Sequence, residues 1–240
     1  MPMNHSKMTD EWIAAALEAN PIRIASNGNI ITCPVRIQFA GINEPMKPMR
    51  DDDDNQNREP KYGCTPLFPP AALAGIERVI KPKLLALAKV THEDRFDAQG
   101  EPLNLHFPFR RQDEKLDQQG FTPGGLFCNV SSKFKPAIVD TAMNEITDPS
   151  RIYNGVWAIL ALNTYSFTTK LKRGVSLGIQ MFMVYADDQK LVSKKADPKA
   201  TFAGVKKIDA AFSADAAFGE GAVRTGHQRP DVAETTRSLW

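Results

Sequence analysis

The sequence GVWAILALNTYSFTTKLKRGVSLGIQMFMVYAD, residues 155–187, contains two long apolar segments joined by the basic tetrapeptide TKLK. Residues 155–168 and 173–187 are each long enough for a β-strand, and a four-residue connection is typical of a hairpin. The second segment ends near Tyr185, after which two aspartates turn the chain. We therefore expect an antiparallel β-hairpin here.

Three further strands are expected before this hairpin. Residues 29–39 have apolar side chains at every second position, which is typical of a half-buried strand. Residues 61–68 predict a second strand, which Pro66 should place at a sheet edge or end early. Residues 124–133 alternate again and predict a third. Most of these strands should pair antiparallel.

Two helical segments and a long loop complete the expected order of elements. Residues 10–19 predict a short helix, and residues 69–90 a longer one that Pro82 should break or kink. Residues 41–60 contain three prolines and four consecutive aspartates, which indicates a long, mobile loop. The fold class is therefore mainly β with an α insertion: a small antiparallel β-barrel with a helix between strands 2 and 3.

Composition restricts the function classes. The chain has 240 residues, and its formal charge of +2 does not indicate a nucleic-acid-binding protein by itself. Three cysteines without CxxC spacing, and no apolar run at the N-terminus, indicate a reduced cytoplasmic protein. The longest apolar run, residues 156–162, is far short of the about 20 residues that cross a bilayer. We expect no membrane partner.

Catalytic and metal-binding motifs are missing from the sequence. The four histidines lack zinc-site spacing, and there is no nucleophile elbow, Walker loop or dinucleotide fingerprint. A metal site at Asp51–Asp54 is disfavoured, because consecutive carboxylates do not converge on one ion. The sequence therefore predicts no enzyme, no metal site and no cofactor.

Aromatic and cationic residues occur together near the expected strand ends. Bases of single-stranded nucleic acid stack on rings, while ammonium and guanidinium groups neutralise phosphates. The alternative is that the rings belong to the core and the lysines protect a solvent-exposed edge. The candidate DNA-binding residues are Phe127, Lys133, Lys135, Trp157, Asn163, Tyr165, Phe167, Lys170, Lys172, Arg173, Arg110 and Arg111.

The order of several motifs resembles one known family. KYGCTPLFPP before a helix, GGLFCNVSSKFKPAIVD at 124–140, IYNGVWA and NTYSF at the two ends of one strand, and GVSLGIQ after the hairpin are similar to bacteriophage-encoded single-stranded DNA-binding proteins. The similarity covers roughly residues 30–202. Ile159 and Ala161 stand where that family commonly has polar residues, which assigns the middle of the strand to the core.

The resemblance implies an oligonucleotide-binding (OB) barrel that coats single-stranded DNA (ssDNA) during phage replication or recombination in the cytoplasm of the infected bacterial host. The implied organisation is an N-terminal extension with a short helix at 1–28, an OB-fold domain at 29–208 and a flexible tail at 209–240. The alternative is a β-barrel that serves as a protein-interaction or virion structural module.

The C-terminal tail is nearly neutral but ends in Leu239 and Trp240. By the same resemblance, Trp240 is a candidate contact for phage replication or recombination proteins. A homodimer, the preference for DNA over RNA, the site size and strand annealing all stay open at this point.

Overall fold

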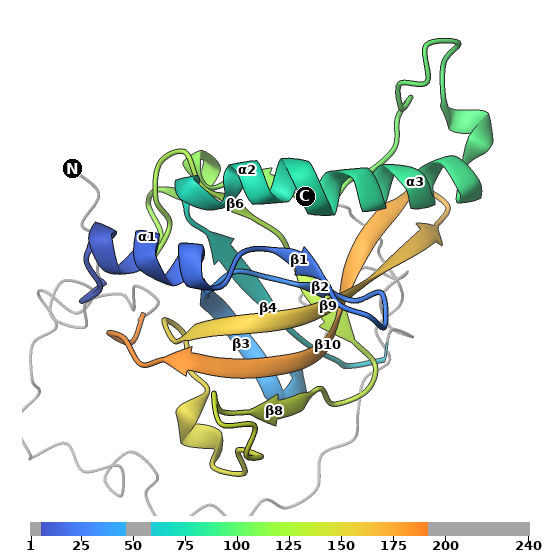
Figure 1. The fold of residues 1–240 in the computed structure, drawn as a ribbon. Helices are drawn as coiled ribbons and strands as arrows, with labels where there is room; N and C mark the ends of the chain where they lie inside the picture. The colour runs from blue at the N-terminus through green and yellow to red at the C-terminus, as the bar shows by residue number, and fades with distance from the viewer. Residues whose placement is uncertain (1–5, 47–58, 192–240) are drawn as a thin grey trace, which may run out of the picture. The chain divides into compact units, whose positions relative to one another are not determined.

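The computed structural model describes residues 6–46 and 59–191. All described residues belong to one compact unit. Its helices are α1 (Asp10–Ala19), α2 (Leu73–Gly75) and α3 (Lys81–Thr91). Its strands are β1 (Arg23–Ile24), β2 (Ile30–Ile31), β3 (Val35–Met46), β4 (Lys61–Phe68), β5 (Arg110–Arg111), β6 (Leu126–Phe127), β7 (Val130–Ser132), β8 (Ala137–Val139), β9 (Trp157–Thr168) and β10 (Arg173–Ala186) (Figure 1).

The strands form one curled sheet, in the order β1-β2-β9-β3-β4-β6-β5. β10 pairs antiparallel with β9 along almost its whole length, so the expected hairpin is confirmed. β7 pairs with β4, and β8 pairs with β10 as the only parallel pair among the described strands. The expected fold class is confirmed as well: a mainly antiparallel half-barrel with a helical insertion between β4 and β6.

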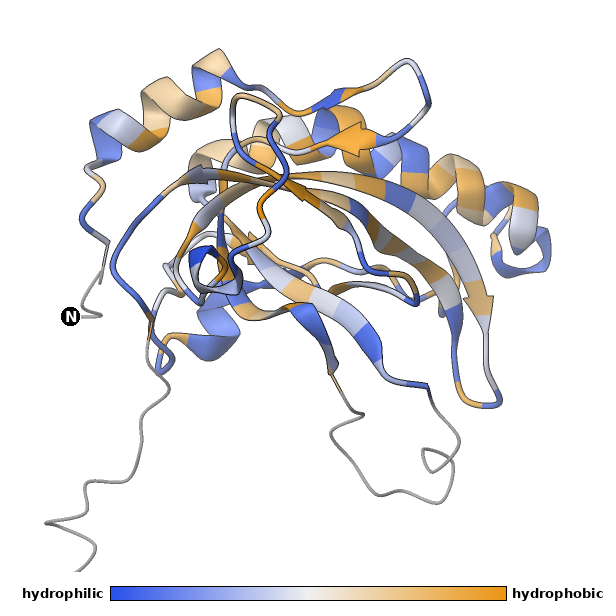
Figure 2. Ribbon diagram, turned by 90° about the horizontal axis from the view of Figure 1, so that it is seen from below, coloured by the Kyte–Doolittle hydropathy of each residue, from blue (hydrophilic) through white to orange (hydrophobic). Residues whose placement is uncertain are grey.

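The hairpin has one core side and one outward side. Ala158, Leu160 and Leu162 of β9 are fully buried on the core side, which α3 and the π-helical segment Ile76–Ile80 before it cover with apolar side chains such as Leu84 and Ile80. Figure 2 shows that hydrophobic and hydrophilic residues are mixed along the helical segment at residues 70–91. We call the other side of the hairpin the outward face. It comprises Ile159, Ala161, Asn163, Tyr165 and Phe167 of β9 and their cross-strand partners Met183, Met181, Gly178, Ser176 and Gly174 of β10.

The prediction for Pro66 was wrong, and so was the predicted break at Pro82. Pro66 neither ends β4 nor lies at an edge, because it pairs with Ile37 of β3 on one side. On its other side Pro66 faces the gap between β6 and β7, where no strand pairs with it. The N–H that proline lacks is therefore not needed for a hydrogen bond between strands. Pro82 does not break the helix: residues 70–91 are helical throughout, and a π-helical segment, Ile76–Ile80, precedes the proline and adjusts the hydrogen-bond pattern.

The segment from 29 to 46 also differs from the prediction. β2 and β3 are separate strands, and β3 continues to Met46, well into the expected loop. The polar side chains Thr32, Arg36 and Gln38 are buried, so this segment is covered on both faces rather than half-buried. The Asp51–Asp54 run lies outside the described residues.

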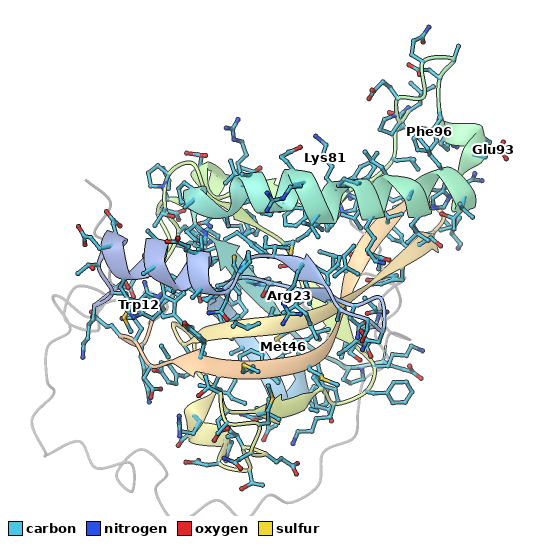
Figure 3. The ribbon with its side chains drawn as sticks, in the orientation of Figure 1. Trp12, Arg23, Met46, Lys81, Glu93 and Phe96 are labelled. Carbon is cyan, nitrogen blue, oxygen red and sulfur yellow. The ribbon has the colours of Figure 1, made fainter. Side chains whose placement is uncertain are left out.

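Helix α1, expected within an N-terminal extension, packs onto the start of β9. Thr9 caps it by accepting a hydrogen bond from the backbone N–H of Trp12. The Trp12 ring, which is labelled in Figure 3, lies edge-on to Trp157 with ring centroids 5.4 Å apart and is tilted against Tyr185 with ring centroids 6.0 Å apart. Throughout residues 6–46 and 59–191, no helix has both the length and the apolar character needed to cross a bilayer.

Candidate nucleic-acid interface

The loop at residues 104–107 extends the sheet at the tip of the β9–β10 hairpin. The N–H of His106 donates to the carbonyl of Arg173 at 2.9 Å, and the N–H of Val175 donates to the carbonyl of His106 at 3.0 Å. Glycine is required at position 174, because a Cβ there would collide with the backbone of His106. This close approach places the loop beside the basic turn of the hairpin.

A hollow of about 510 Å³ lies between the loop and the turn, and we call it the basic hollow. Partial burial, together with the positive charges of Lys172 and Arg110, lowers the pKa of His106. Asp94, next to Arg95, binds Arg173 at 3.1 Å. Such a hollow attracts anions, and phosphate oxygens fit its donors. Its lining residues are Arg95, Asn104, Leu105, His106, Thr168, Thr169, Lys170, Leu171, Lys172 and Arg173.

The outward face leads away from the basic hollow with two rings and an amide. Phe167 packs edge-on against His106, with ring centroids 5.9 Å apart. Two residues further along β9, the Tyr165 side chain is 37% exposed. Asn163 accepts a hydrogen bond from Gln180 at 3.1 Å. The structure therefore brings Asn163, Tyr165 and Phe167 into line with Lys170, Lys172 and Arg173, as the sequence predicts.

The loop after β7 places an exposed ring between two predicted lysines. Phe134 is 82% exposed and stands between Lys133 and Lys135, both of which are exposed. Lys133 binds Glu59 at 2.9 Å, and this hydrogen bond raises the pKa of Lys133. Strand β7 runs next to β10. A Cβ atom added at Gly178 of β10 would lie 3.5 Å from the carbonyl oxygen of Ser131 in β7.

Phe134, His106 and Arg95 were missed by reasoning from the sequence. They lie in loops or short turns, where alternation gives no guidance. The available signal was the Lys-Phe-Lys tripeptide at 133–135, which has the same ring-and-cation pattern as the hairpin.

Two predicted stacking residues are covered. Trp157 is 3% exposed and Phe127 is 2% exposed, so the expected exposure of both rings was wrong. Trp12 covers Trp157, whose Nε1–H donates to Asp188 at 2.9 Å. Phe121 packs edge-on against Phe127, with ring centroids 5.4 Å apart. As placed, neither ring has a face available to a base.

The predicted arginine pair does not line the basic hollow. Strand β5 consists of Arg110 and Arg111, and it pairs with β6 at the far end of the sheet. The Arg110 guanidinium lies 5.3 Å from the Phe127 ring centroid and also binds Glu114. Arg111 has Asp113 at 3.7 Å. Of the two arginines, Arg110 influences the basic hollow at a distance, because its positive charge contributes to the lowered pKa of His106, which lines the hollow.

Metal-ligating groups do not cluster in the part of the chain that the structure describes: no group of three or more His, Cys, Asp or Glu side chains could hold an ion there. Burial raises the pKa of Cys33 to about 12 and leaves this thiol protonated at neutral pH.

Comparison with known proteins supports the resemblance. Two solved structures of the single-stranded DNA-binding protein from bacteriophage Enc34 share the fold. The one in complex with ssDNA has a TM-score of 0.58 and 17% identity, covering 70% of this chain and 92% of that chain. The other has a TM-score of 0.56 and 16% identity, covering 75% and 93%. No curated protein sequence matches this chain.

The family match covers most of the sequence. The family described as "Enterobacter phage Enc34, ssDNA-binding protein" matches residues 28–231, a range that contains nearly all of the described strands. The resemblance stated from the motif order is thereby confirmed. The chain belongs to the family of phage ssDNA-binding proteins represented by that of Enterobacter phage Enc34.

Proposed function

We propose that this protein coats ssDNA without strong sequence preference during phage replication or recombination, and that the strand runs from the basic hollow along the outward face. The observation that carries the proposal is the continuity of the two: Phe167 touches His106 of the hollow, and Tyr165 follows on the same face. Family membership and the Enc34 structure solved with ssDNA support it.

Each group has a separate role in this proposal. The rings of Tyr165, Phe167 and Phe134 stack on bases, and stacking tolerates any sequence because every base has a π-face. Asn163 offers a hydrogen-bonding amide beside them. The cations that meet phosphates are Lys133, Lys135, Lys170, Lys172, Arg173 and Arg95, with Arg110 and Arg111 adding positive potential at a distance.

Phe127 and Trp157 support the interface from inside. Phe127 positions Arg110 by holding its guanidinium over the ring, and Trp157 joins α1 to the hairpin. The proposal assigns no catalytic step to any residue, and the protein acts by binding in the infected cell.

Protein partners belong to the same proposal. Trp240, outside the described residues, is the candidate contact for phage replication or recombination proteins, and a homodimer is a further candidate state. A pull-down from infected cells tests the tail: we expect deletion of residues 231–240 to release specific partners, and an unchanged partner set would contradict this role.

Fluorescence anisotropy with a labelled 16-nucleotide thymidine oligomer tests DNA binding. If phosphates contact only Lys170, Lys172 and Arg173, a plot of the logarithm of the binding constant against the logarithm of the salt concentration should have a slope of about −2. Further phosphate contacts would make this slope steeper. Phe134→Ala should weaken binding about tenfold, whereas Val90→Ala, which truncates an equally exposed side chain on α3, should not. Absence of binding at low salt would contradict the proposal and favour the interaction or virion module.

A further inference from the structure

A second hollow, of about 350 Å³, lies beside the end of the outward face remote from the hairpin tip. Ile159 and Met183, which are cross-strand partners, belong to the outward face and line it. Alternate residues of a strand share a face, so this hollow opens on the side that carries Asn163 and Tyr165. Its described lining residues are Ala19, Asn20, Pro21, Arg23, Ile31, Thr32, Thr141, Met143, Ile159, Met183 and Tyr185.

The walls of this second hollow suit a flat, largely apolar group. Tyr185 supplies an aromatic ring, which Asn20 holds by donating to its hydroxyl at 3.2 Å and which Trp12 supports from α1. Met183 is half-buried and Met143 is exposed, and unbranched thioether side chains adapt to differently shaped bases. A volume of this size lies within the range of small-molecule sites.

The charge at the second hollow suits a phosphate next to that flat group. Arg23, an exposed residue labelled in Figure 3, lines the hollow and makes no ion pair within residues 6–46 and 59–191. None of the described lining residues is an aspartate or a glutamate. An anionic chain can therefore lie across its opening without a repelling carboxylate in the lining.

Residues of three neighbouring strands lie between the two hollows. Ala161, Met181 and Ile31 lie side by side on β9, β10 and β2. Met181 is 50% exposed, an apolar surface open to solvent in the middle of the face. From Phe167 to Ile159 the strand advances eight residues, or roughly 26 Å, which is several nucleotides of a stretched single strand.

We propose that the second hollow receives a nucleobase of the same ssDNA strand, with its ring against Tyr185 and Met183 and its phosphate on Arg23. This inference rests on the proposed function and extends it: the strand follows the whole outward face, from the hairpin tip to helix α1. Helix α1 then has a role in binding, because it holds Tyr185 in place. The middle of β9 belongs to the core, as the sequence predicts, because Ile159 and Ala161 are each only 8% exposed; the DNA path crosses this part of the face over Met181 and Met183 of β10.

Affinity measured against oligomer length tests this footprint. Thymidine oligomers of about 4 to 16 nucleotides span the site sizes of OB folds. Wild-type affinity should rise until the strand reaches both hollows. Met183→Glu and Arg23→Ala should bind the longest oligomer about tenfold more weakly, as expected for one lost base contact, but the shortest oligomer as well as wild type. Val90→Glu and Arg78→Ala are the controls, because they make the same changes in charge on the helix that covers the core side. Both should bind oligomers of every length as wild type does.

A second measurement avoids substitutions. In wild-type protein with ¹³C-labelled methionine methyl groups, saturation with the 16-nucleotide oligomer should shift the Met183 and Met143 signals by the ring current of a base. The inference is overturned if both signals stay unmoved at saturation, or if Met183→Glu and Arg23→Ala bind all lengths as wild type. It is also overturned if Met183→Glu changes only the oligomeric state, because the surface is then a protein contact. If wild type binds no oligomer, the proposed function itself fails.

Discussion

The two ends of strand β9 carry aromatic residues on the same face but in opposite environments. At the beginning, Trp157 lies under Trp12 and is 3% exposed. At the end, Tyr165 is 37% exposed and Phe167 adjoins the basic hollow. Alternation along a strand determines which face a ring is on, whereas the neighbouring elements determine whether a ligand can reach it. The Trp157 ring therefore stabilises the fold, whereas the Tyr165 ring is open to a ligand.

A buried polar cluster at Asp188 anchors the Trp157 end. The Asp188 side chain is fully buried, 3.4 Å from the guanidinium of Arg36. It accepts hydrogen bonds from the Ser6 hydroxyl at 2.6 Å, the Lys7 N–H at 2.7 Å and the Trp157 indole at 2.9 Å. The cluster thus joins the segment before α1 to β3, β9 and the end of β10.

The largest expected effect is on stability, at this anchored end. Asp188→Asn removes the charge that compensates Arg36, and breaking a buried ion pair typically destabilises by about 3–5 kcal/mol. Chemical denaturation at pH 7 should show this loss. Below the unfolding transition, the affinity for a short ssDNA oligomer that reaches only the hairpin tip should be close to that of wild type. A free energy of unfolding within about 0.5 kcal/mol of wild type would show that the cluster does not anchor the fold.

The pH dependence of the same variant is the control. Burial raises the pKa of Asp188, but hydrogen bonds, led by that from Ser6, outweigh it and leave the pKa below its ordinary value of 3.8. Stability from this carboxylate is therefore fully present above about pH 4 and is lost as the pH falls through the folded-state value. The difference between wild type and Asp188→Asn should shrink in that range. A constant difference from pH 7 to pH 2 would contradict the assignment.

The next largest effect is on binding, at the open end. Tyr165→Ala should weaken ssDNA binding by about 1–3 kcal/mol, which is about fivefold to 150-fold, because a stacked base loses its ring. The free energy of unfolding should change little. Tyr165→Phe keeps the ring and should bind nearly as wild type. Equal binding by Tyr165→Ala and wild type in titrations would remove Tyr165 from the interface.

Much of this contrast could be predicted, and the reasons for the failures are physical. The hairpin, and the face that holds Trp157 and Tyr165 together, follow from the period of two along β9. The burial of Trp157 depends on Trp12, about 145 residues earlier, and periodicity cannot reveal a cover so distant in sequence. Phe134 was missed for the converse reason, because it lies in a loop without periodicity.

Proline rules failed where the partner strand or helix adapts. Pro66 is tolerated inside the sheet because the facing edge is interrupted between β6 and β7. The rule about Pro82 failed because the helix changes its hydrogen-bond pattern before the proline. Both outcomes depend on neighbours that local sequence does not specify.

The smallest effect concerns an acid that competes with phosphate. Asp94 holds Arg173 at 3.1 Å on the surface of the protein, and exposed pairs of this kind contribute at most about 1 kcal/mol. Asp94→Asn should therefore increase ssDNA affinity up to about fivefold at low salt. Glu77→Gln, which frees Lys81 on the helix, should leave affinity unchanged. A weaker complex with Asp94→Asn would mean that Asp94 positions Arg173 for DNA rather than competing for it.

The salt dependence of ssDNA binding tests most directly whether the hairpin tip is the phosphate-binding end. The double variant Lys170→Ala/Lys172→Ala is compared with Lys83→Ala/Lys89→Ala, which removes the same charge from α3. Each lost phosphate contact reduces the log-log salt slope by about 0.7, so the tip variant should have a slope less steep by about 1.4 while the helix variant matches wild type. Equal slopes for the tip variant and wild type would contradict the account.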